Sequence, residues 1–171
     1  MPTQYSFVTH WKINAPVAQV WDAIYHSTEW PNWWKGVKKV VDKNTGDING
    51  IGAIRDYTWQ SILPYTLTFS MQLTEKETHK KLSGVAFGEL EGNGTWIFEE
   101  VDGTTLVTYY WNVITNKPWM NYLSFFLKPA FQYNHDVVMK WGEEGLKKKL
   151  AFIATLQPKP VHEPSIIVNN L

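Results

Sequence analysis

Alternating hydrophobic and polar residues characterise most of the chain. Residues 5–13 alternate between two faces, which predicts a first β-strand. Six further segments between residues 37 and 115 keep the two-residue period and show no helical pattern. Turn-forming residues separate these segments at 44–47, 62–64, 76–78, 92–94 and 102–103. The clearest alternation buries one face, formed by Tyr65, Leu67, Phe69, Met71 and Leu73. The pattern therefore predicts an antiparallel sheet of seven strands with one apolar face.

We expect helical structure in three places. After Pro16, apolar residues recur at positions 17, 20, 21 and 24, which predicts a short helix of about three turns. The segment Trp30-Pro31-Asn32-Trp33-Trp34 predicts another helical turn, whose rings either pack between helix and sheet rim or form the lip of an entrance. A long helical segment starts at Pro118, and we expect Pro129 to kink or interrupt it because proline lacks an amide proton.

The long C-terminal helix has one apolar and one charged face. On a helical wheel the apolar face comprises Leu127, Phe131, Asn134, Val138, Trp141 and Gly145. The opposite face comprises Asp136, Lys140, Glu143 and Lys147. We therefore expect this helix to lie across the concave face of the curved sheet, with a gap where sheet and helix diverge. We expect residues 157–171 to form a tail with one apolar patch at 166–168.

This layout and several local motifs resemble the START-like superfamily (SRPBCC), and within it the polyketide cyclase/dehydrase and lipid-transport branch. The motifs are Lys12-Ile13-Asn14-Ala15-Pro16 with Val20-Trp21, Trp30-Pro31-Asn32-Trp33-Trp34, Gly92-Asn93-Gly94-Thr95-Trp96, and Asn134-His135-Asp136 with Met139, Gly142 and Gly145-Leu146. The resemblance covers about residues 5–151. It implies an α+β helix-grip fold: a curved seven-stranded antiparallel sheet wrapped around a long C-terminal helix, with two short helices between strands 1 and 2.

We expect one such domain over residues 1–156 and a tail over residues 157–171. Members of the superfamily bind sterols, lipids, quinones or plant hormones, and only some of them are enzymes, so the resemblance implies a binding cavity rather than one particular activity.

Composition and charge exclude several classes of function. Hydrophobic residues make up 44% of the 171 residues, enough to bury a core. Sixteen basic residues balance sixteen acidic ones, which removes the field that attracts nucleic acid. Cysteine is absent and the five histidines are scattered, so we expect neither a metal nor another cofactor. With no recognisable secretory signal or transmembrane segment, we expect a cytoplasmic protein.

Arg55 is the first candidate for ligand binding because it is the only arginine of the chain. Strand parity places it on an inward face with Tyr57 and Trp59. A buried guanidinium is too costly without a partner, so an inward Arg55 requires an internal acid, a ligand anion or a water-filled cavity. The alternative is a salt bridge at the rim of the sheet.

The other candidates are aromatic residues on two strands and polar residues on the long helix. Tyr57, Trp59, Tyr109 and Trp111 occupy matching alternate positions, where their rings either line a cavity or fill an ordinary core; the chain has 10 Trp, 8 Tyr and 8 Phe. Asn134 and His135 lie on or beside the apolar helix face, where their polar atoms bond either the protein or a ligand.

Three functions remain open from the sequence. The favoured one is binding or transport of a hydrophobic small molecule (a lipid, a polyketide-like chain or an aromatic compound) with an acidic or carbonyl end near Arg55. The second is a cyclase, aromatase or dehydratase that uses Arg55, Tyr57 and His135; no catalytic constellation supports it. The third is a quinone- or membrane-associated interaction protein that presents the tryptophan segment or the tail, with a homodimer through a swapped tail strand as one mechanism.

Overall fold

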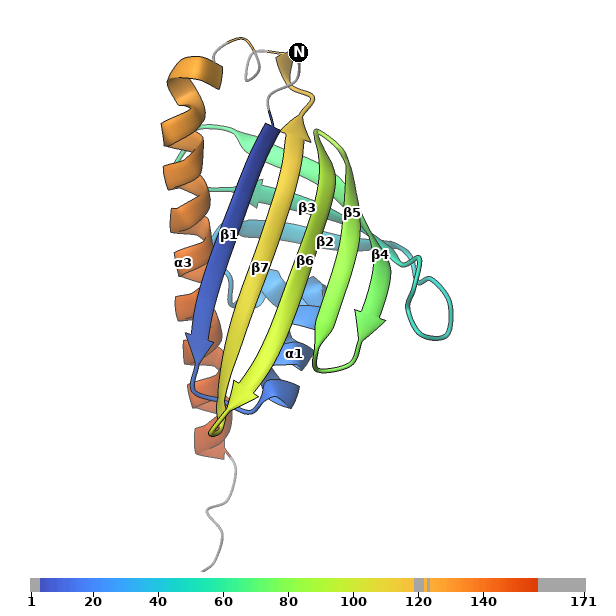
Figure 1. Cartoon of the computed structure of the whole chain (residues 1–171), viewed down its shortest axis with the longest axis vertical. Helices are drawn as coiled ribbons and strands as arrows, with labels where there is room; N and C mark the ends of the chain where they lie inside the picture. Colours follow the sequence, from blue (N-terminus) through green and yellow to red (C-terminus); the bar gives the residue numbers. More distant parts are fainter. Residues whose placement is uncertain (1–3, 119–121, 123, 157–171) are drawn as a thin grey trace, which may run out of the picture.

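A curved antiparallel sheet and a long helix form the body of the protein (Figure 1). The computed structural model describes residues 4–118, 122 and 124–156. The elements are β1 (Gln4–Ile13), α1 (Val17–Tyr25), η1 (Ser27–Asn32), β2 (Val37–Asn44), β3 (Ile54–Gln60), β4 (Thr66–Glu77), β5 (Lys81–Gly88), β6 (Leu90–Val101), β7 (Thr104–Thr115) and α3 (Ser124–Leu156). The α+β helix-grip fold, with seven strands and two short helices between the first two, is confirmed.

The seven strands form a single sheet in the order β1-β7-β6-β5-β4-β3-β2, and every neighbouring pair is antiparallel. The first two strands of the sequence are therefore the two edges. In Figure 1 the steep β1 and β7 and the nearly horizontal β2 and β3 show how strongly the sheet coils, with α3 beside β1 and α1 below. This coiling gives the sheet the concave face that the helix covers.

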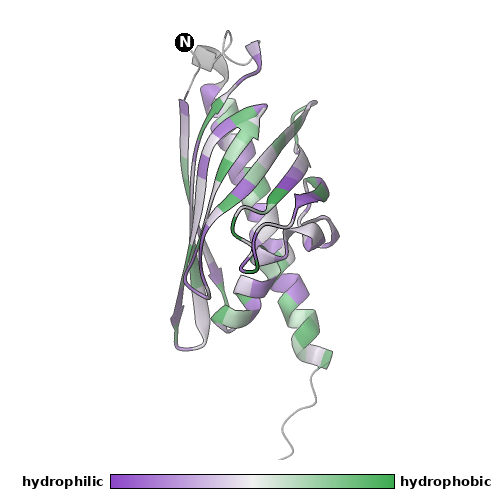
Figure 2. Cartoon of the chain, turned by 90° about the vertical axis from the view of Figure 1, so that its right-hand side faces the viewer, coloured by the Kyte–Doolittle hydropathy of each residue, from purple (hydrophilic) through white to green (hydrophobic). Residues whose placement is uncertain are grey.

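Side-chain alternation along the strands follows the predicted parity. On β1, Tyr5, Phe7 and Trp11 are buried while Val8 between them is 56% exposed. Figure 2 shows hydrophobic and hydrophilic residues alternating along the strands. The residues of β4 predicted to be inward, together with Tyr65 before it, line the interior space described below. Because one face is buried, a register slip would expose it, so the alternation fixes the register.

The predicted turn at residues 92–94 is wrong. Strand β6 runs through these residues, and the chain reverses before it, at Glu89 between β5 and β6. The glycines serve close packing instead of a turn. A Cβ on Gly92 would lie 2.0 Å from the carbonyl oxygen of Asn112, and one on Gly94 would lie 2.6 Å from Oη of Tyr109. Glycine inside a strand often marks such a close approach.

Helix α3 differs from the prediction in two ways. It continues through Pro129, so of the two expected effects of this proline, a kink or an interruption, the interruption is absent. Its buried row is also rotated by about one position from the predicted face and consists of Phe131, Met139, Gly142, Leu146 and Leu150. Trp141 lies at the flank, where its ring packs under the ammonium group of Lys35 at 4.3 Å. The predicted helix start at Pro118 adjoins residues 119–121, which lie outside the described part.

The tryptophan segment holds α3 against the sheet. Trp30 and Trp34 are buried, with exposed fractions of 7% and 1%, which confirms the packing interpretation. Nε1 of Trp34 donates a hydrogen bond to the carbonyl of Val138 on α3 at 2.8 Å. Gly142 and Gly145 of α3 face Trp34 and Trp33, where any Cβ would collide. The glycines therefore let the helix approach the tryptophans closely.

Two further expectations concern the ends of the chain and membrane crossing. The predicted tail at 157–171, with its apolar patch at 166–168, lies outside the described residues. Within the described part, none of the helices combines the length and the apolar character needed to cross a lipid bilayer.

Candidate functional site: an aromatic cavity under the helix

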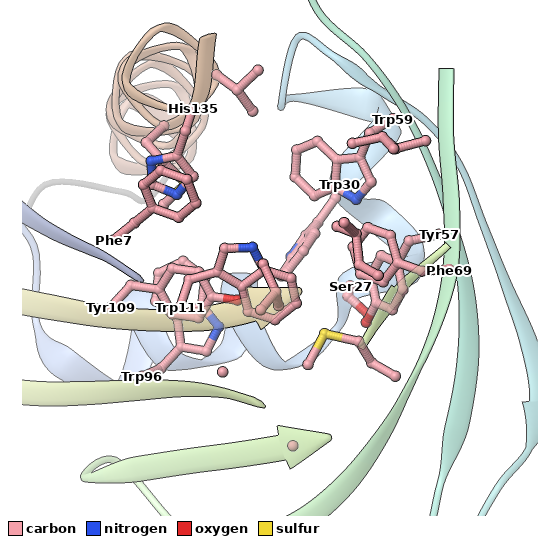
Figure 3. Close-up of a pocket in the computed structure, with 18 of the residues that line it drawn as sticks. Phe7, Ser27, Trp30, Tyr57, Trp59, Phe69, Trp96, Tyr109, Trp111 and His135 are labelled. Carbon is pink, nitrogen blue, oxygen red and sulfur yellow. The ribbon is translucent and has the colours of Figure 1, made fainter. Parts of the chain in front are cut away.

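A cavity of about 230 Å³ lies between the concave face of the sheet, α3 and η1 (Figure 3). All seven residues proposed from the sequence line this cavity: Arg55, Tyr57, Trp59, Tyr109, Trp111, Asn134 and His135. They come from β3, β7 and α3, which are far apart in sequence, so the fold brings the candidates to one place.

The inner wall of the cavity is a continuous series of aromatic rings. The rings of Trp96 and Tyr109 stack with centroids 3.9 Å apart, and Tyr109 stacks on Trp111 at 5.9 Å. Phe69 continues the series, 5.7 Å from Trp111 and 6.0 Å from Tyr57. Rings that hold each other in place keep a fixed shape, so this wall is suited to a flat or apolar guest.

Two glycines on the central strands let neighbouring groups, including the ring wall, lie close against the sheet. Gly84 on β5 and Gly94 on β6 are direct cross-strand partners, and both line the cavity. Neighbouring strands thus carry no side chain at the centre of the sheet. A Cβ on Gly94 would lie 2.6 Å from the Tyr109 hydroxyl, so a larger residue would displace the ring wall.

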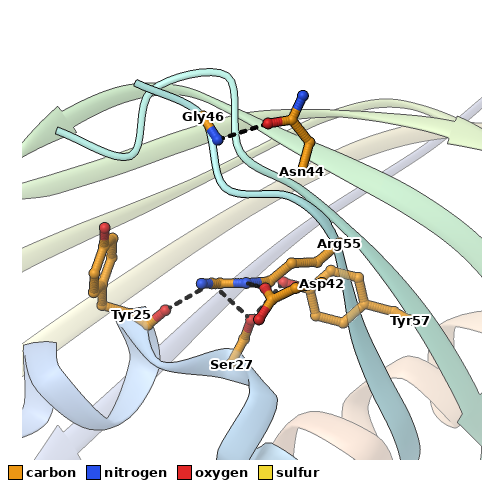
Figure 4. A network of polar contacts seen from close by, with 7 residues as sticks. All are labelled: Tyr25, Ser27, Asp42, Asn44, Gly46, Arg55 and Tyr57. Carbon is orange, nitrogen blue, oxygen red and sulfur yellow. Dashed lines mark hydrogen bonds and ion pairs between the residues drawn. The ribbon is translucent and has the colours of Figure 1, made fainter. Parts of the chain in front are cut away.

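Arg55 forms a polar border of the cavity (Figure 4). Its Nε donates to Oδ1 of Asp42 at 2.7 Å, and its Nη1 donates to the Tyr25 carbonyl at 3.0 Å and to Oγ of Ser27 at 3.2 Å. Asp42 is its cross-strand partner on β2. Burial lowers the pKa of Arg55, but the hydrogen bond and the negative charge of Asp42 raise it. The pKa is higher than usual overall, so the guanidinium stays charged. The acid that an inward arginine requires is thus supplied by the protein.

Tyr57 and Ser27 connect this border to the interior. Their hydroxyl oxygens lie 2.7 Å apart, and both residues are buried. Burial raises the pKa of Tyr57, and the opposing effects of Ser27 and Arg55 do not cancel this. At neutral pH Tyr57 is therefore an uncharged phenol that can both accept and donate a hydrogen bond.

Asn134 and His135 lie on the α3 side of the cavity. Oδ1 of Asn134 accepts a hydrogen bond from Ser61, which lies just after β3. The His135 ring stacks on Phe7 with centroids 4.1 Å apart and planes inclined by 9°. Burial lowers the pKa of His135, opposed by Asp136, whose carboxylate lies 3.5 Å from Nδ1. His135 is therefore a neutral ring at pH 7.

Several polar atoms around the cavity have no hydrogen-bond partner among the described residues. They are Oη of Tyr5, Nε1 of Trp59 and Nε2 of His135, while Nδ1 of His135 has only the Asp136 carboxylate at the long distance of 3.5 Å. Buried polar atoms are normally paired. These atoms belong to residues that line the cavity, but less than 1 Å² of each atom is accessible, so the atoms themselves do not face its open space. Across the described part of the chain, no group of three histidine, aspartate or glutamate side chains is placed to hold a metal ion.

Sequence reasoning missed other lining residues. Trp96 follows the inward parity of β6, but the misplaced turn at 92–94 concealed it. Phe69 was assigned to the buried face without being recognised as cavity wall. Ser27 and Trp30 belong to η1, whose short irregular sequence gives no periodic signal.

Comparison with models of known protein families identifies the family of this chain. The family model for polyketide cyclase / dehydrase and lipid transport matches residues 4–136. The chain belongs to this family. The resemblance of the sequence to the START-like superfamily is thereby confirmed. A comparison with curated protein sequences gave no match.

Solved structures share the fold at low sequence identity. The Zhui aromatase/cyclase from Streptomyces sp. R1128 is 9% identical with a TM-score of 0.73, over 89% of this chain and 96% of that chain. A START superfamily protein from Mycobacterium smegmatis is 9% identical with a TM-score of 0.68, over 88% and 98%. The di-domain aromatase/cyclase BexL is 16% identical with a TM-score of 0.62 over 84% of this chain, which spans about half (50%) of BexL. At these identities the likeness establishes the fold alone.

Proposed function

We propose that this protein binds a hydrophobic small molecule that carries at least one ring, in the cavity between the sheet and α3. The observation that carries the proposal is the series of stacked rings from Trp96 to Tyr57 that faces open space instead of a filled core. A cavity lined mainly by rings and bordered by a few polar groups is the usual form of a small-molecule site.

The size of the cavity limits the ligand. An apolar cavity of about 150 Å³ is enough to bind benzene. At about 230 Å³ this cavity has roughly one and a half times that volume, which suits a fused two-ring compound or one ring with a short chain. A longer lipid or polyketide chain would project from the cavity past the helix or the sheet rim.

The border at Arg55 gives the ligand a direction. Apolar rings surround most of the cavity, whereas Arg55, Ser27 and Tyr57 place polar groups at one side. We place an oxygen-bearing end of the ligand there, and its ring against the wall formed by Phe69 and Trp111. The ring then gains apolar burial while the oxygen keeps hydrogen bonds.

The binding proposal is tested first on the purified protein. Protein denatured in organic solvent should release a bound aromatic or acyl compound that mass spectrometry detects. In parallel, 2-acetylnaphthalene should quench tryptophan fluorescence with a saturable isotherm, because five tryptophans line the cavity, namely Trp30, Trp34, Trp59, Trp96 and Trp111. Absence of both signals would refute binding in this cavity.

A matched pair of variants locates the binding site. Met71→Trp adds a large side chain to the cavity lining, whereas Thr68→Trp adds the same group at an exposed position of the same strand. Binding should be lost in the first variant and kept in the second. Equal binding by both variants would place the ligand elsewhere.

A cyclase or dehydratase is the second candidate. Its support is the family match together with two neutral proton-bearing groups, Tyr57 and His135, which border opposite sides of the cavity in Figure 3. Such groups can polarise a carbonyl and move a proton. Conversion of a supplied poly-keto chain to a cyclised product, lost in His135→Phe, would establish this activity, and recovery of the unchanged chain would exclude it for that substrate.

A further inference from the structure

We propose that the ligand is anchored by a neutral carbonyl oxygen that accepts a hydrogen bond from the hydroxyl of Tyr57, and that carboxylates are disfavoured. This inference rests on the proposed function and chooses between the acidic and the carbonyl end that the sequence left open. It follows from the direction of each hydrogen bond in the network of Figure 4.

The direction is set at Arg55, which has only donors. Its Nη1 donates to Oγ of Ser27 at 3.2 Å, so that oxygen acts as an acceptor. Ser27 is 2% exposed, and its own hydroxyl proton therefore needs a protein acceptor. Within the described residues, the other partner of Ser27 Oγ is the hydroxyl oxygen of Tyr57 at 2.7 Å. Ser27 thus donates to Tyr57.

The proton of Tyr57 is consequently free to point elsewhere. The hydroxyl cannot donate back to Ser27, whose proton occupies that contact, and the nearby Arg55 guanidinium accepts no hydrogen bond. Tyr57 is 7% exposed and lines the cavity. A buried donor without an acceptor is costly, so the acceptor is supplied by what occupies the cavity.

The electrostatics of the border distinguish a neutral oxygen from an anion. The Arg55 charge is already balanced by Asp42 at 2.7 Å. A ligand carboxylate at Tyr57 would therefore add a second negative charge close to Asp42 and would lose its hydration in an aromatic cavity. A ketone, aldehyde or ester carbonyl satisfies the Tyr57 donor without that cost. The chain of bonds from Arg55 through Ser27 also polarises the Tyr57 hydroxyl and strengthens its donation.

The test compares three probes of the same ring size. We expect 2-acetylnaphthalene to bind the wild-type protein about three- to tenfold more tightly than 2-ethylnaphthalene, which has the same shape but no acceptor. 2-Naphthoate should bind more weakly than the ketone. The infrared carbonyl stretch of the bound ketone should lie at lower wavenumber than in hexane. Tighter binding of 2-naphthoate than of the ketone would overturn the proposal.

The variants assign this preference to one hydroxyl group. In Tyr57→Phe the ratio of ketone to hydrocarbon affinity should fall to about one, and the carbonyl stretch should move back toward its value in hexane. The control is Tyr110→Phe, which removes a hydroxyl from the exposed face of β7 and should keep the wild-type ratio.

The possible outcomes separate this inference from the proposed function. An unchanged ratio in Tyr57→Phe, or an unshifted carbonyl stretch in the wild type, would overturn the anchor while binding itself stands. If none of the three probes binds, the proposed function fails and the inference fails with it. Because the infrared measurement uses the wild-type protein, it remains decisive if Tyr57→Phe does not fold.

Discussion

Replacement of Gly145 by alanine tests how α3 is seated over the cavity. In an exposed helix, glycine to alanine stabilises by about 1 kcal/mol because alanine is the better helix former. At Gly145 the added Cβ would lie 1.9 Å from the carbonyl oxygen of Trp33. Helix propensity and packing therefore predict opposite signs for the same substitution.

The size of the collision decides the sign. Real Cβ atoms essentially never come within 3.0 Å of another heavy atom, so the helix and the Trp33 backbone must separate by at least about 1.1 Å, the difference from 1.9 Å. Neither side moves easily, because the neighbouring Trp34 is 1% exposed and bonded to the Val138 carbonyl. Overpacking of this kind costs about 1–3 kcal/mol. We take the upper end of that range and expect a net loss of about 1–2 kcal/mol after the gain in helix propensity.

Urea unfolding followed by circular dichroism measures this loss. Glu144→Gly, at the exposed neighbouring position, is the matched control because it reports the intrinsic cost of glycine in this helix, about 1 kcal/mol. Both variants should be less stable than the wild type, although Gly145→Ala removes a glycine from the helix and Glu144→Gly introduces one. A Gly145→Ala protein as stable as the wild type, or more stable, would refute the described contact between α3 and Trp33.

Three further predictions concern the cavity and its border. Arg55→Met removes charge-assisted bonds to Asp42 and its other partners, so the free energy of unfolding in urea should fall by about 1.5–3 kcal/mol; an unchanged value would show that the network contributes nothing. Gly94→Ala places a methyl group 2.6 Å from the Tyr109 hydroxyl, and titration calorimetry should show about tenfold weaker binding of 2-acetylnaphthalene, whereas equal affinity would mean that the ligand avoids this wall. Burial lowers the pKa of His135 in the folded state. As the pH falls below about 6.5, the pKa of histidine in the unfolded chain, the unfolded state binds more protons than the folded state, and the free energy of unfolding decreases. His135→Phe should therefore gain stability relative to the wild type between pH 7 and pH 5 in urea titrations, and a constant difference would contradict the buried neutral ring.

Much of the sheet could be predicted from the sequence because one face is buried. A two-residue period then assigns each side chain to a face, as for Tyr57 and Trp59 on β3, and both line the cavity as their parity requires. The same parity places Tyr109 and Trp111 of β7 in the ring wall that also contains Tyr57. Which of these rings face open space depends on what lies opposite them, and no local pattern encodes that.

The errors arose where distant contacts override local preference. Gly92 and Gly94 have the composition of a turn, but their role is to admit Asn112 and the Tyr109 ring, which belong to the next strand. The rotation of α3 is set by its contact with the tryptophan segment, more than a hundred residues earlier in the sequence, as the bond between Trp34 and Val138 shows. Ser27 had no signal of its own because its role depends on Arg55 and Tyr57 on another element.

The central claim is that the space between the ring wall and α3 receives a ligand. A crystal structure of the protein with 2-bromonaphthalene, measured at the bromine absorption edge, tests it most directly. The account predicts one anomalous peak inside the cavity, in contact with the ring series between Trp111 and Tyr57. A cavity filled by rearranged rings, or bromine bound only outside it, would contradict the account.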